Sequence, residues 1–193
     1  MKHPITDMVA AIVAGVLFAA LICLCLGWLE DVAWGEEGDE VATVVRAIRR
    51  LQPATDDERA ARLAGIFVGA GHETRIDPLL LVAIAMRESS LSEDVEQLER
   101  LGSRGERGLM QCHGAALRVR PTGCGEDLQG AHCQVYTGAM WLAWVRDHCE
   151  GSMWVTVAAY GRRRCPSESE ARADRNAAIA ASYYSLAGGV DWR

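Results

Sequence analysis

The sequence feature that most restricts the fold is an uncharged, apolar run from Pro78 to Met86. Asp77 directly before this run, with proline at the next position, is a typical start of an α-helix. The run therefore predicts a helix that begins after Asp77 and carries an apolar stripe facing away from water.

Glu88 is the first acidic residue after this run. It follows Ile84 by four residues and Leu81 by seven, so it lies on the same helix face as these apolar residues. We expect its carboxyl to be partly desolvated, which favours the neutral form that a proton-donating catalytic acid needs. The alternative interpretation is structural, because a carboxylate at a helix end can also pair with Arg87 or Arg104.

Residues 8–29 contain no charged side chain. About 20 apolar residues cross a bilayer as a helix, so this segment predicts a transmembrane signal anchor. Lys2 precedes it and only acidic charges occupy residues 30–40, which places residues 1–7 in the cytoplasm and the rest of the chain outside it. The alternative is a cleaved signal peptide. Such peptides have a shorter apolar core of about 7–15 residues and an A-x-A-like cleavage site, which we do not find here.

Residues 30–54 are predicted to form a juxtamembrane spacer with a short amphipathic helix that ends before Pro53. The sequence Thr55-Asp56-Asp57-Glu58 then has the pattern of a capping box that opens the next helix. From residue 55 to residue 193 no sustained strand alternation occurs. We therefore predict one mainly α-helical domain with a possible small hairpin.

Three further elements are expected in this domain. The tryptophan-rich segment 134–149 is the best candidate for a central buried helix. A second capping box at 167–170 and the glycine pair at 188–189 bound a last helix. Three residues share one apolar face of that helix: Ile179, Tyr183 and Leu186. Between these segments, Ser152 begins another helix, or residues 154–157 form a short strand.

Seven cysteines are present, and two of them, Cys23 and Cys25, lie in the predicted span. In an oxidising compartment the downstream cysteines are expected to pair. Local pairing gives Cys124 with Cys133 and Cys149 with Cys165, and it leaves Cys112 as an apolar free thiol. Zinc is the competing interpretation, but neither C-x2-C nor H-x3-H spacing occurs, so we expect no metal and no cofactor.

The net charge of −6 and the absence of a basic face or a nucleic-acid motif argue against a nucleic-acid partner. The arginine run 162–164 could contact an anionic substrate, although so short a run is more often a solvated loop.

Three short segments resemble the signature motifs of the soluble lytic transglycosylase (SLT) domain, which has a lysozyme-like helical fold. They are Asp77-Pro78 through Glu88-Ser89, then Gly108-Leu109-Met110-Gln111, then Ala158-Ala159-Tyr160-Gly161. The resemblance covers roughly residues 56–189. Each motif alone is weak, and their order and separation together make the pattern specific.

The resemblance implies cleavage of peptidoglycan glycan strands between N-acetylmuramic acid and N-acetylglucosamine without water. Glu88 matches the single catalytic acid, which then accepts a proton from the C6 hydroxyl as a 1,6-anhydro ring closes. The substrate's acetamido group helps to stabilise the cationic centre, so one carboxylate suffices, unlike in two-carboxylate glycosidases. Accordingly, we see no second acid in a comparably apolar setting among Glu93, Asp94, Glu96, Glu99 and Glu106.

The resemblance also assigns substrate-binding or supporting roles to six residues: Ser89, Gly108, Met110, Gln111, Tyr160 and Tyr183. Ser89 would fix the helix end, Gly108 would allow close backbone approach, and Gln111 would hydrogen-bond the sugar. Tyr183 would contact the catalytic carboxyl, with Tyr184 as the adjacent alternative. On packing alone, Met110 and the tryptophans fit a core better than a cleft.

Three positions depart from the family pattern. Gly161 stands where asparagine is usual, Leu91 where an aromatic residue is common, and Cys112 follows the second motif. The first departure removes an expected hydrogen bond to the sugar. None of the three removes the catalytic acid.

Three functional hypotheses follow. The first is a lytic transglycosylase anchored in the bacterial cytoplasmic membrane, which acts in wall remodelling or opens the wall for an envelope machine. The second is a phage lysis enzyme with a releasable anchor, which performs the same chemistry or goose-type lysozyme hydrolysis. The small residues of the span and a disulfide exchange at Cys23 or Cys25 motivate it. The third, motivated by Gly161, is a non-catalytic SLT-like scaffold that binds peptidoglycan.

Overall fold

The computed structural model describes residues 38–162 and 164–189. All regular secondary structure within these ranges is helical, which confirms the prediction of a mainly α-helical domain. Residues 38–51 form the first described helix. The later elements are α2 (Asp57–Thr74), α3 (Pro78–Ser89), α4 (Glu93–Glu96), the 3-10 helix η1 (Gly114–Val119), α5 (Gly130–Cys149), α6 (Met153–Tyr160), α7 (Glu168–Arg172) and α8 (Arg175–Ala187).

Several sequence predictions lie outside the described residues: the segment 1–7, the span 8–29, the spacer up to residue 37, Cys23, Cys25 and Arg163. Among the residues that are described, no helix is both long and apolar enough to cross a membrane. The larger compact unit begins at Val41. Val44 and Ile48 are buried in the same core as Phe67 and Ile84. The helix that we predicted as part of a spacer thus packs with the domain that we expected to begin at residue 55.

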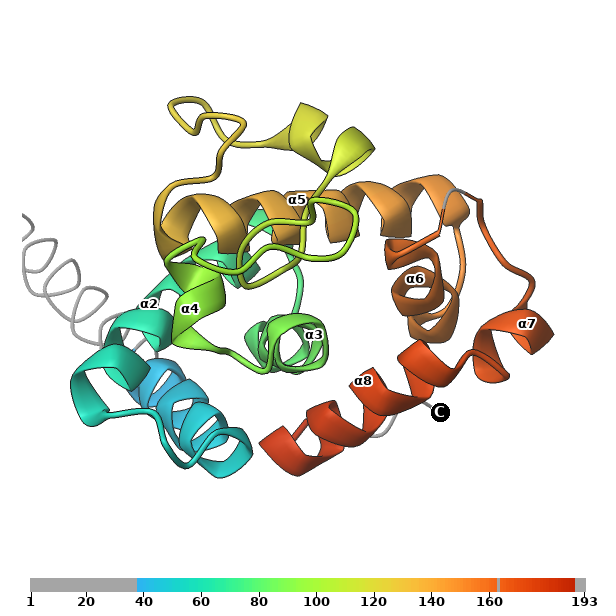
Figure 1. Cartoon of the computed structure of the whole chain (residues 1–193). Helices are drawn as coiled ribbons and strands as arrows, with labels where there is room; N and C mark the ends of the chain where they lie inside the picture. Colours follow the sequence, from blue (N-terminus) through green and yellow to red (C-terminus); the bar gives the residue numbers. More distant parts are fainter. Residues whose placement is uncertain (1–37, 163, 190–193) are drawn as a thin grey trace, which may run out of the picture. The chain divides into compact units, whose positions relative to one another are not determined.

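Helix α3 forms the centre of this unit (Figure 1). The Asp77 side chain caps its N-terminus by accepting a hydrogen bond from the Leu79 amide at 2.8 Å, with Pro78 in the first turn. No residue from Leu80 to Ala85 has exposed surface. The start of this helix is as predicted, but its burial extends beyond the expected apolar stripe, and α3, instead of the segment 134–149, is the central helix.

Helix α8 packs against α3 (Figure 1). Its buried face consists of Ala177, Ala180, Tyr184 and Ala187. The predicted face of Ile179, Tyr183 and Leu186 is wrong for Leu186, which is 47% exposed, whereas Ile179 and Tyr183 are half-buried. Alanine side chains allow two helices to approach closely, and this packing outweighs the greater hydrophobicity of the larger residues.

Helix α5 buries its small and polar residues instead of its tryptophans. Gln134, Gly138 and Leu142 face the core, whereas Trp144 is 45% exposed and Trp141 is partly buried. The assignment of the tryptophans to the core is therefore wrong for Trp144. Met110 packs against Gly138, where an added Cβ would collide with its side chain.

The helix caps differ in part from the predicted ones. The N-cap of α2 is Asp56, which accepts from the Arg59 amide, while the Thr55 hydroxyl is buried without a partner. The capping box at Ser167 is confirmed. However, it opens only the short α7, because Asp174 caps a separate α8.

The predicted hairpin is reduced to a single antiparallel bridge between Arg107 and Cys112. Each residue's amide donates to the other's carbonyl at 3.0 Å, which closes a tight turn. Ser152 caps α6, so the alternative strand at 154–157 is helical instead.

The predicted disulfides are both present: Cys124 with Cys133, and Cys149 with Cys165. Cys112 is a buried free cysteine, as expected.

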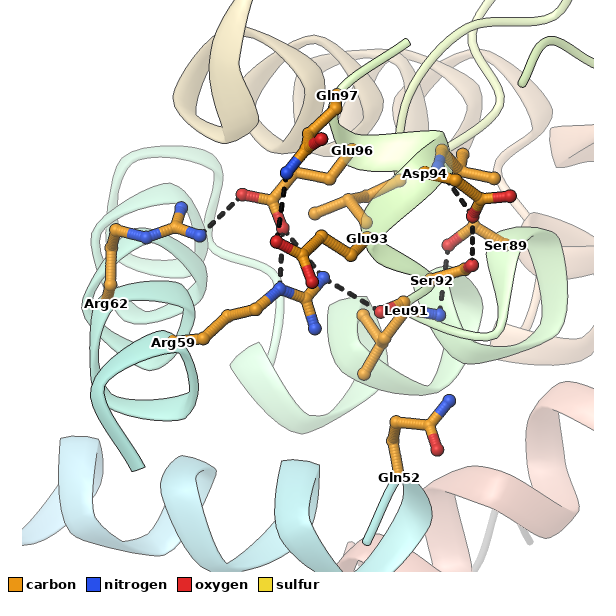
Figure 2. A network of polar contacts seen from close by, with 12 residues as sticks. Gln52, Arg59, Arg62, Ser89, Leu91, Ser92, Glu93, Asp94, Glu96 and Gln97 are labelled. Carbon is orange, nitrogen blue, oxygen red and sulfur yellow. Dashed lines mark hydrogen bonds and ion pairs between the residues drawn. The ribbon is translucent and has the colours of Figure 1, made fainter. Parts of the chain in front are cut away.

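A buried ion network attaches α4 to α2 (Figure 2). Arg59 donates from Nε and Nη2 to Glu96 Oε2 at 2.9 and 2.7 Å, and from Nη2 to the Leu91 carbonyl at 2.8 Å. Arg62 Nη2 donates to Glu96 Oε1 at 2.6 Å. Glu96 is thus an internal anion, contrary to the solvated setting that its polar neighbours indicated.

The Gln134 amide on α5 holds the irregular chain between α4 and η1. Its Oε1 accepts from the Leu109 amide at 2.9 Å. Its Nε2 donates to the carbonyls of Glu96 at 2.7 Å and of Leu128 at 3.2 Å. Because Gln134 is fully buried, it satisfies three backbone groups that water does not reach.

We expect Glu96→Gln to lower the free energy of unfolding by about 3 kcal/mol, because it leaves the buried Arg59 guanidinium without its counter-charge. Glu93→Gln is the matched control: Glu93 is exposed three residues earlier and should change this free energy by no more than about 0.5 kcal/mol. Urea unfolding followed by circular dichroism measures both. Equal effects of the two substitutions would contradict a stabilising role for the network.

Gln134→Met should lower the free energy of unfolding by about 2–3 kcal/mol, because an apolar side chain of similar size leaves the three backbone groups unsatisfied. Gln129→Met, at the exposed N-cap position of α5 five residues earlier, is the control and should be nearly neutral because the Gln129 side chain makes no cap hydrogen bond. Hydrogen exchange should show loss of protection at the Leu109 amide in Gln134→Met alone. Retained protection there would argue against this hydrogen bond.

Candidate active site

A cleft of about 650 Å³ brings parts of all three sequence motifs together. Glu88 enters it from the last turn of α3, Gln111 and Cys112 from the tight turn, and Tyr160 from the end of α6. Its other lining residues are Gly102, Ser103, Arg104, Glu106, His113, Gly114, Ala115, Ala116, Trp141, Gly161 and Arg162. Of the site residues predicted from the sequence, Glu88, Gln111 and Tyr160 line the cleft, whereas Ser89, Gly108, Met110 and Tyr183 do not.

Glu88 pairs with Arg87, the residue before it. The Glu88 side chain is 24% exposed, whereas that of Arg87 is only 8% exposed. Arg87 also donates to the Asn176 carbonyl at 3.4 Å, and its guanidinium lies 5.9 Å from the centre of the Tyr160 ring. Arg87 is thus the arginine partner that we expected if Glu88 were a structural carboxylate at the helix end. The same carboxylate still faces the cleft, because Arg87 is the more deeply buried member of the pair.

The tight turn presents Gln111. The Gln111 backbone is left-handed, with φ 48°, and its Nε2 donates to the Gly108 carbonyl at 2.9 Å. Gly108 also has a positive φ of 67°, and a Cβ added there would collide with the Gln134 side chain. The close approach that glycine permits here is thus to the buried Gln134 amide, instead of to a sugar.

Tyr160 is fixed by the same turn. Its hydroxyl donates to the Met110 carbonyl at 2.9 Å and lies 3.9 Å from Cys112 Sγ. Burial raises the pKa of the Cys112 thiol to about 12 and the pKa of Tyr160 well above its usual value. Burial therefore favours the protonated form of both groups. Met110 is fully buried, which agrees with the core interpretation of that residue.

Glu106 is a second acid in the cleft that we did not predict from the sequence. Its two carboxylate oxygens accept from the Arg104 amide and from Arg104 Nε, both at 2.8 Å. The backbone amide of Arg104 holds the pKa of the Glu106 carboxyl below its usual range, and the guanidinium adds to this effect. Glu106 lies in a charged, glycine-containing stretch without helical periodicity, so no sequence signal indicated its burial.

The remaining predicted residues lie beside the cleft. Ser89 is buried, and its hydroxyl donates to the Ala85 carbonyl at 2.9 Å and accepts from the Leu91 amide at 3.2 Å, where α3 ends. Tyr183 is partly buried against the core. The Tyr184 hydroxyl donates to the Asp77 carboxylate at the opposite end of α3 from Glu88.

In the cleft, Gly161 is exposed, and an added Cβ there would meet no atom within 4 Å. The next residue, Arg162, pairs with Asp174. Within the described parts of the chain, no group of three histidine, cysteine or acidic residues is placed to hold a metal ion.

Residues 66–181 match the family model described as Transglycosylase SLT domain. No curated protein and no solved structure matches the chain. The matched segment contains Glu88, Gln111 and Tyr160, and it ends before Tyr183 and Tyr184. The matched segment spans more than half of the sequence. The fold is helical, and parts of all three motifs line one cleft. The chain therefore belongs to the transglycosylase SLT domain family.

Proposed function

We propose that this protein is a lytic transglycosylase that cuts peptidoglycan between N-acetylmuramic acid and N-acetylglucosamine and leaves a 1,6-anhydro-muramic end. The family supports a peptidoglycan-cleaving function of this type. One observation carries the finer proposal: Glu88 is a partly exposed acid at the end of a buried helix, in the cleft where the three motifs meet.

In the proposed reaction, the protonated Glu88 carboxyl donates its proton to the glycosidic oxygen as the bond to the muramic C1 breaks. The substrate's acetamido group stabilises the positive charge at C1. The Glu88 carboxylate then accepts the proton of the C6 hydroxyl, and O6 bonds to C1. One proton leaves the carboxyl and one returns, so no water is consumed.

Arg87 contacts Oε1 of Glu88, so we assign the proton transfer to Oε2. The contacts of Arg87 with the Asn176 carbonyl and the Tyr160 ring hold the guanidinium in place. We assign a substrate hydrogen bond to Oε1 of Gln111, whose amide nitrogen is occupied by the Gly108 carbonyl. Arg87 and Tyr160 act as positioning residues.

Our proposal places the enzyme at the bacterial cytoplasmic membrane, with residues 8–29 as a single-pass anchor and the SLT domain outside the cytoplasm. The support is the uncharged span with its flanking charges, together with two disulfides in the folded unit. Tethering raises the local concentration of an acidic protein next to its polymer. Wall remodelling or wall opening for an envelope or phage assembly is the setting that follows.

The second candidate reaction is hydrolysis, and Glu106 is the observation that favours it. A carboxylate held ionised in the same cleft could activate a water molecule or stabilise the cationic centre, as in two-carboxylate glycosidases. The products separate the two reactions, because hydrolysis gives reducing ends.

We expect Glu88→Gln to lower the rate of anhydro-muropeptide release by at least about 100-fold, because the amide cannot donate and recover the proton. Purified peptidoglycan incubated with the full-length chain and analysed by mass spectrometry measures this. Glu93→Gln, on the exposed face of α4, should keep the wild-type rate. Unchanged release by Glu88→Gln would refute the assignment, and a wild type that yields no products would leave the scaffold hypothesis.

Glu106→Gln should retain anhydro-muropeptides as the main product, although at a reduced rate, because Glu106 carries no proton in the proposed reaction. Its loss breaks the contacts with Arg104 and loosens the wall of the cleft. Mass spectrometry of the same digests distinguishes anhydro ends from reducing ends. Reducing ends in the wild type that disappear in Glu106→Gln would establish hydrolysis instead.

A further inference from the structure

A second pocket of about 590 Å³ lies next to the cleft. The two share part of their lining, with Gly114, Ala115, Trp141 and Arg162 common to both. The disulfide between Cys149 and Cys165 contributes to its wall. A ligand bound at Glu88 could therefore extend into this second pocket, where the disulfide links two parts of the wall.

One side of this pocket is a ladder of aromatic rings on α5. The rings of Trp141 and Trp144 stack at 4.8 Å with an angle of 10°, and those of Trp144 and His148 at 4.6 Å with an angle of 12°. Trp141 packs against the core at one end of this ladder, whereas Trp144 is 45% exposed, so the stacked rings present a flat, partly exposed aromatic surface. Such surfaces commonly mark binding sites.

The charged side chains that line this pocket are all basic: Arg118, Arg162 and Arg164. Arg162 is held by Asp174 and Arg164 by Glu170. Arg118 projects from η1, is exposed, and has no acidic partner among the described residues. In a protein with a net charge of −6, a pocket whose lining contains arginines and no acid favours an anionic ligand over a cationic one.

We infer that this pocket binds the peptide that muramic acid carries, with Arg118 contacting a peptide carboxylate and the aromatic ladder packing against the peptide's apolar part. The inference rests on the proposed function, because it requires the glycan in the adjoining cleft. Arginine binds carboxylates through paired hydrogen bonds, which matches the free carboxylates of such a peptide. The peptide is attached to the same sugar that Glu88 attacks, so continuity with the cleft favours it over a separate anion.

The test is calorimetric titration of the full-length Glu88→Gln protein, which cannot consume its ligand, with a disaccharide tetrapeptide and with the same disaccharide lacking the peptide. We expect the peptide to improve the dissociation constant by at least about tenfold. Arg118→Glu and, separately, Trp144→Ala should abolish this difference. Arg50→Glu is the charge-matched control at another exposed arginine and should preserve it.

Equal affinities for the two sugars, or a peptide preference that survives both pocket substitutions, would overturn the inference. A competition titration with inorganic phosphate is a further test. Displacement of the tetrapeptide ligand by millimolar phosphate would assign the pocket to phosphate and would also overturn the inference. Cleavage assays with the wild type keep the two proposals separate. Cleavage without a peptide preference rejects only the pocket assignment, whereas peptide-dependent binding without cleavage rejects only the proposed reaction.

Discussion

The complete burial of α3 determines where the functional groups lie. A helix with no exposed residue from Leu80 to Ala85 needs neighbours on every side, and the first helix, α2 and α8 supply side chains to the same core. Polar groups emerge only in its last turn, at Arg87 and Glu88. Ser90 and Leu91 then turn the chain with positive φ angles, and Ser89 bonds the freed backbone groups. Glu88 thus reaches the cleft because α3 ends just after it.

The opposite wall of the cleft has little regular structure, so its stability depends on buried polar side chains. Backbone groups without a helical partner cost free energy when water cannot reach them. Gln134 accepts from one backbone amide, that of Leu109, and donates to two backbone carbonyls, those of Glu96 and Leu128. The ion pair of Arg59 with Glu96 anchors α4, which precedes this irregular chain. The Tyr160 hydroxyl satisfies the Met110 carbonyl in the same way. The polar residues inside this domain therefore hold a loop in the shape that presents Gln111.

Local signals in the sequence predicted the parts of the fold that depend on local chemistry. The start of α3 at Asp77, the capping box at Ser167 and both disulfides are in the structure as expected. Features that depend on packing between distant segments were not predictable. Alanines on α8 face the core because α3 lies close, and Trp144 is exposed because α5 turns its small residues inward. The burial of Glu106 depends on a loop conformation that residue spacing does not encode.

Our proposal for Glu88 does not follow from burial alone. Glu96 and Glu106 are both more deeply buried than Glu88, and each is held by an arginine. Glu106 receives its hydrogen bonds on both oxygens from a backbone amide and a guanidinium, which lowers its pKa and favours its charged form. Glu88 has a contact from Arg87 on one oxygen and keeps part of its surface open to the cleft. A carboxyl that must give up a proton and take it back needs such an oxygen, so accessibility and hydrogen bonding, more than desolvation, support our proposal that Glu88 is the proton carrier.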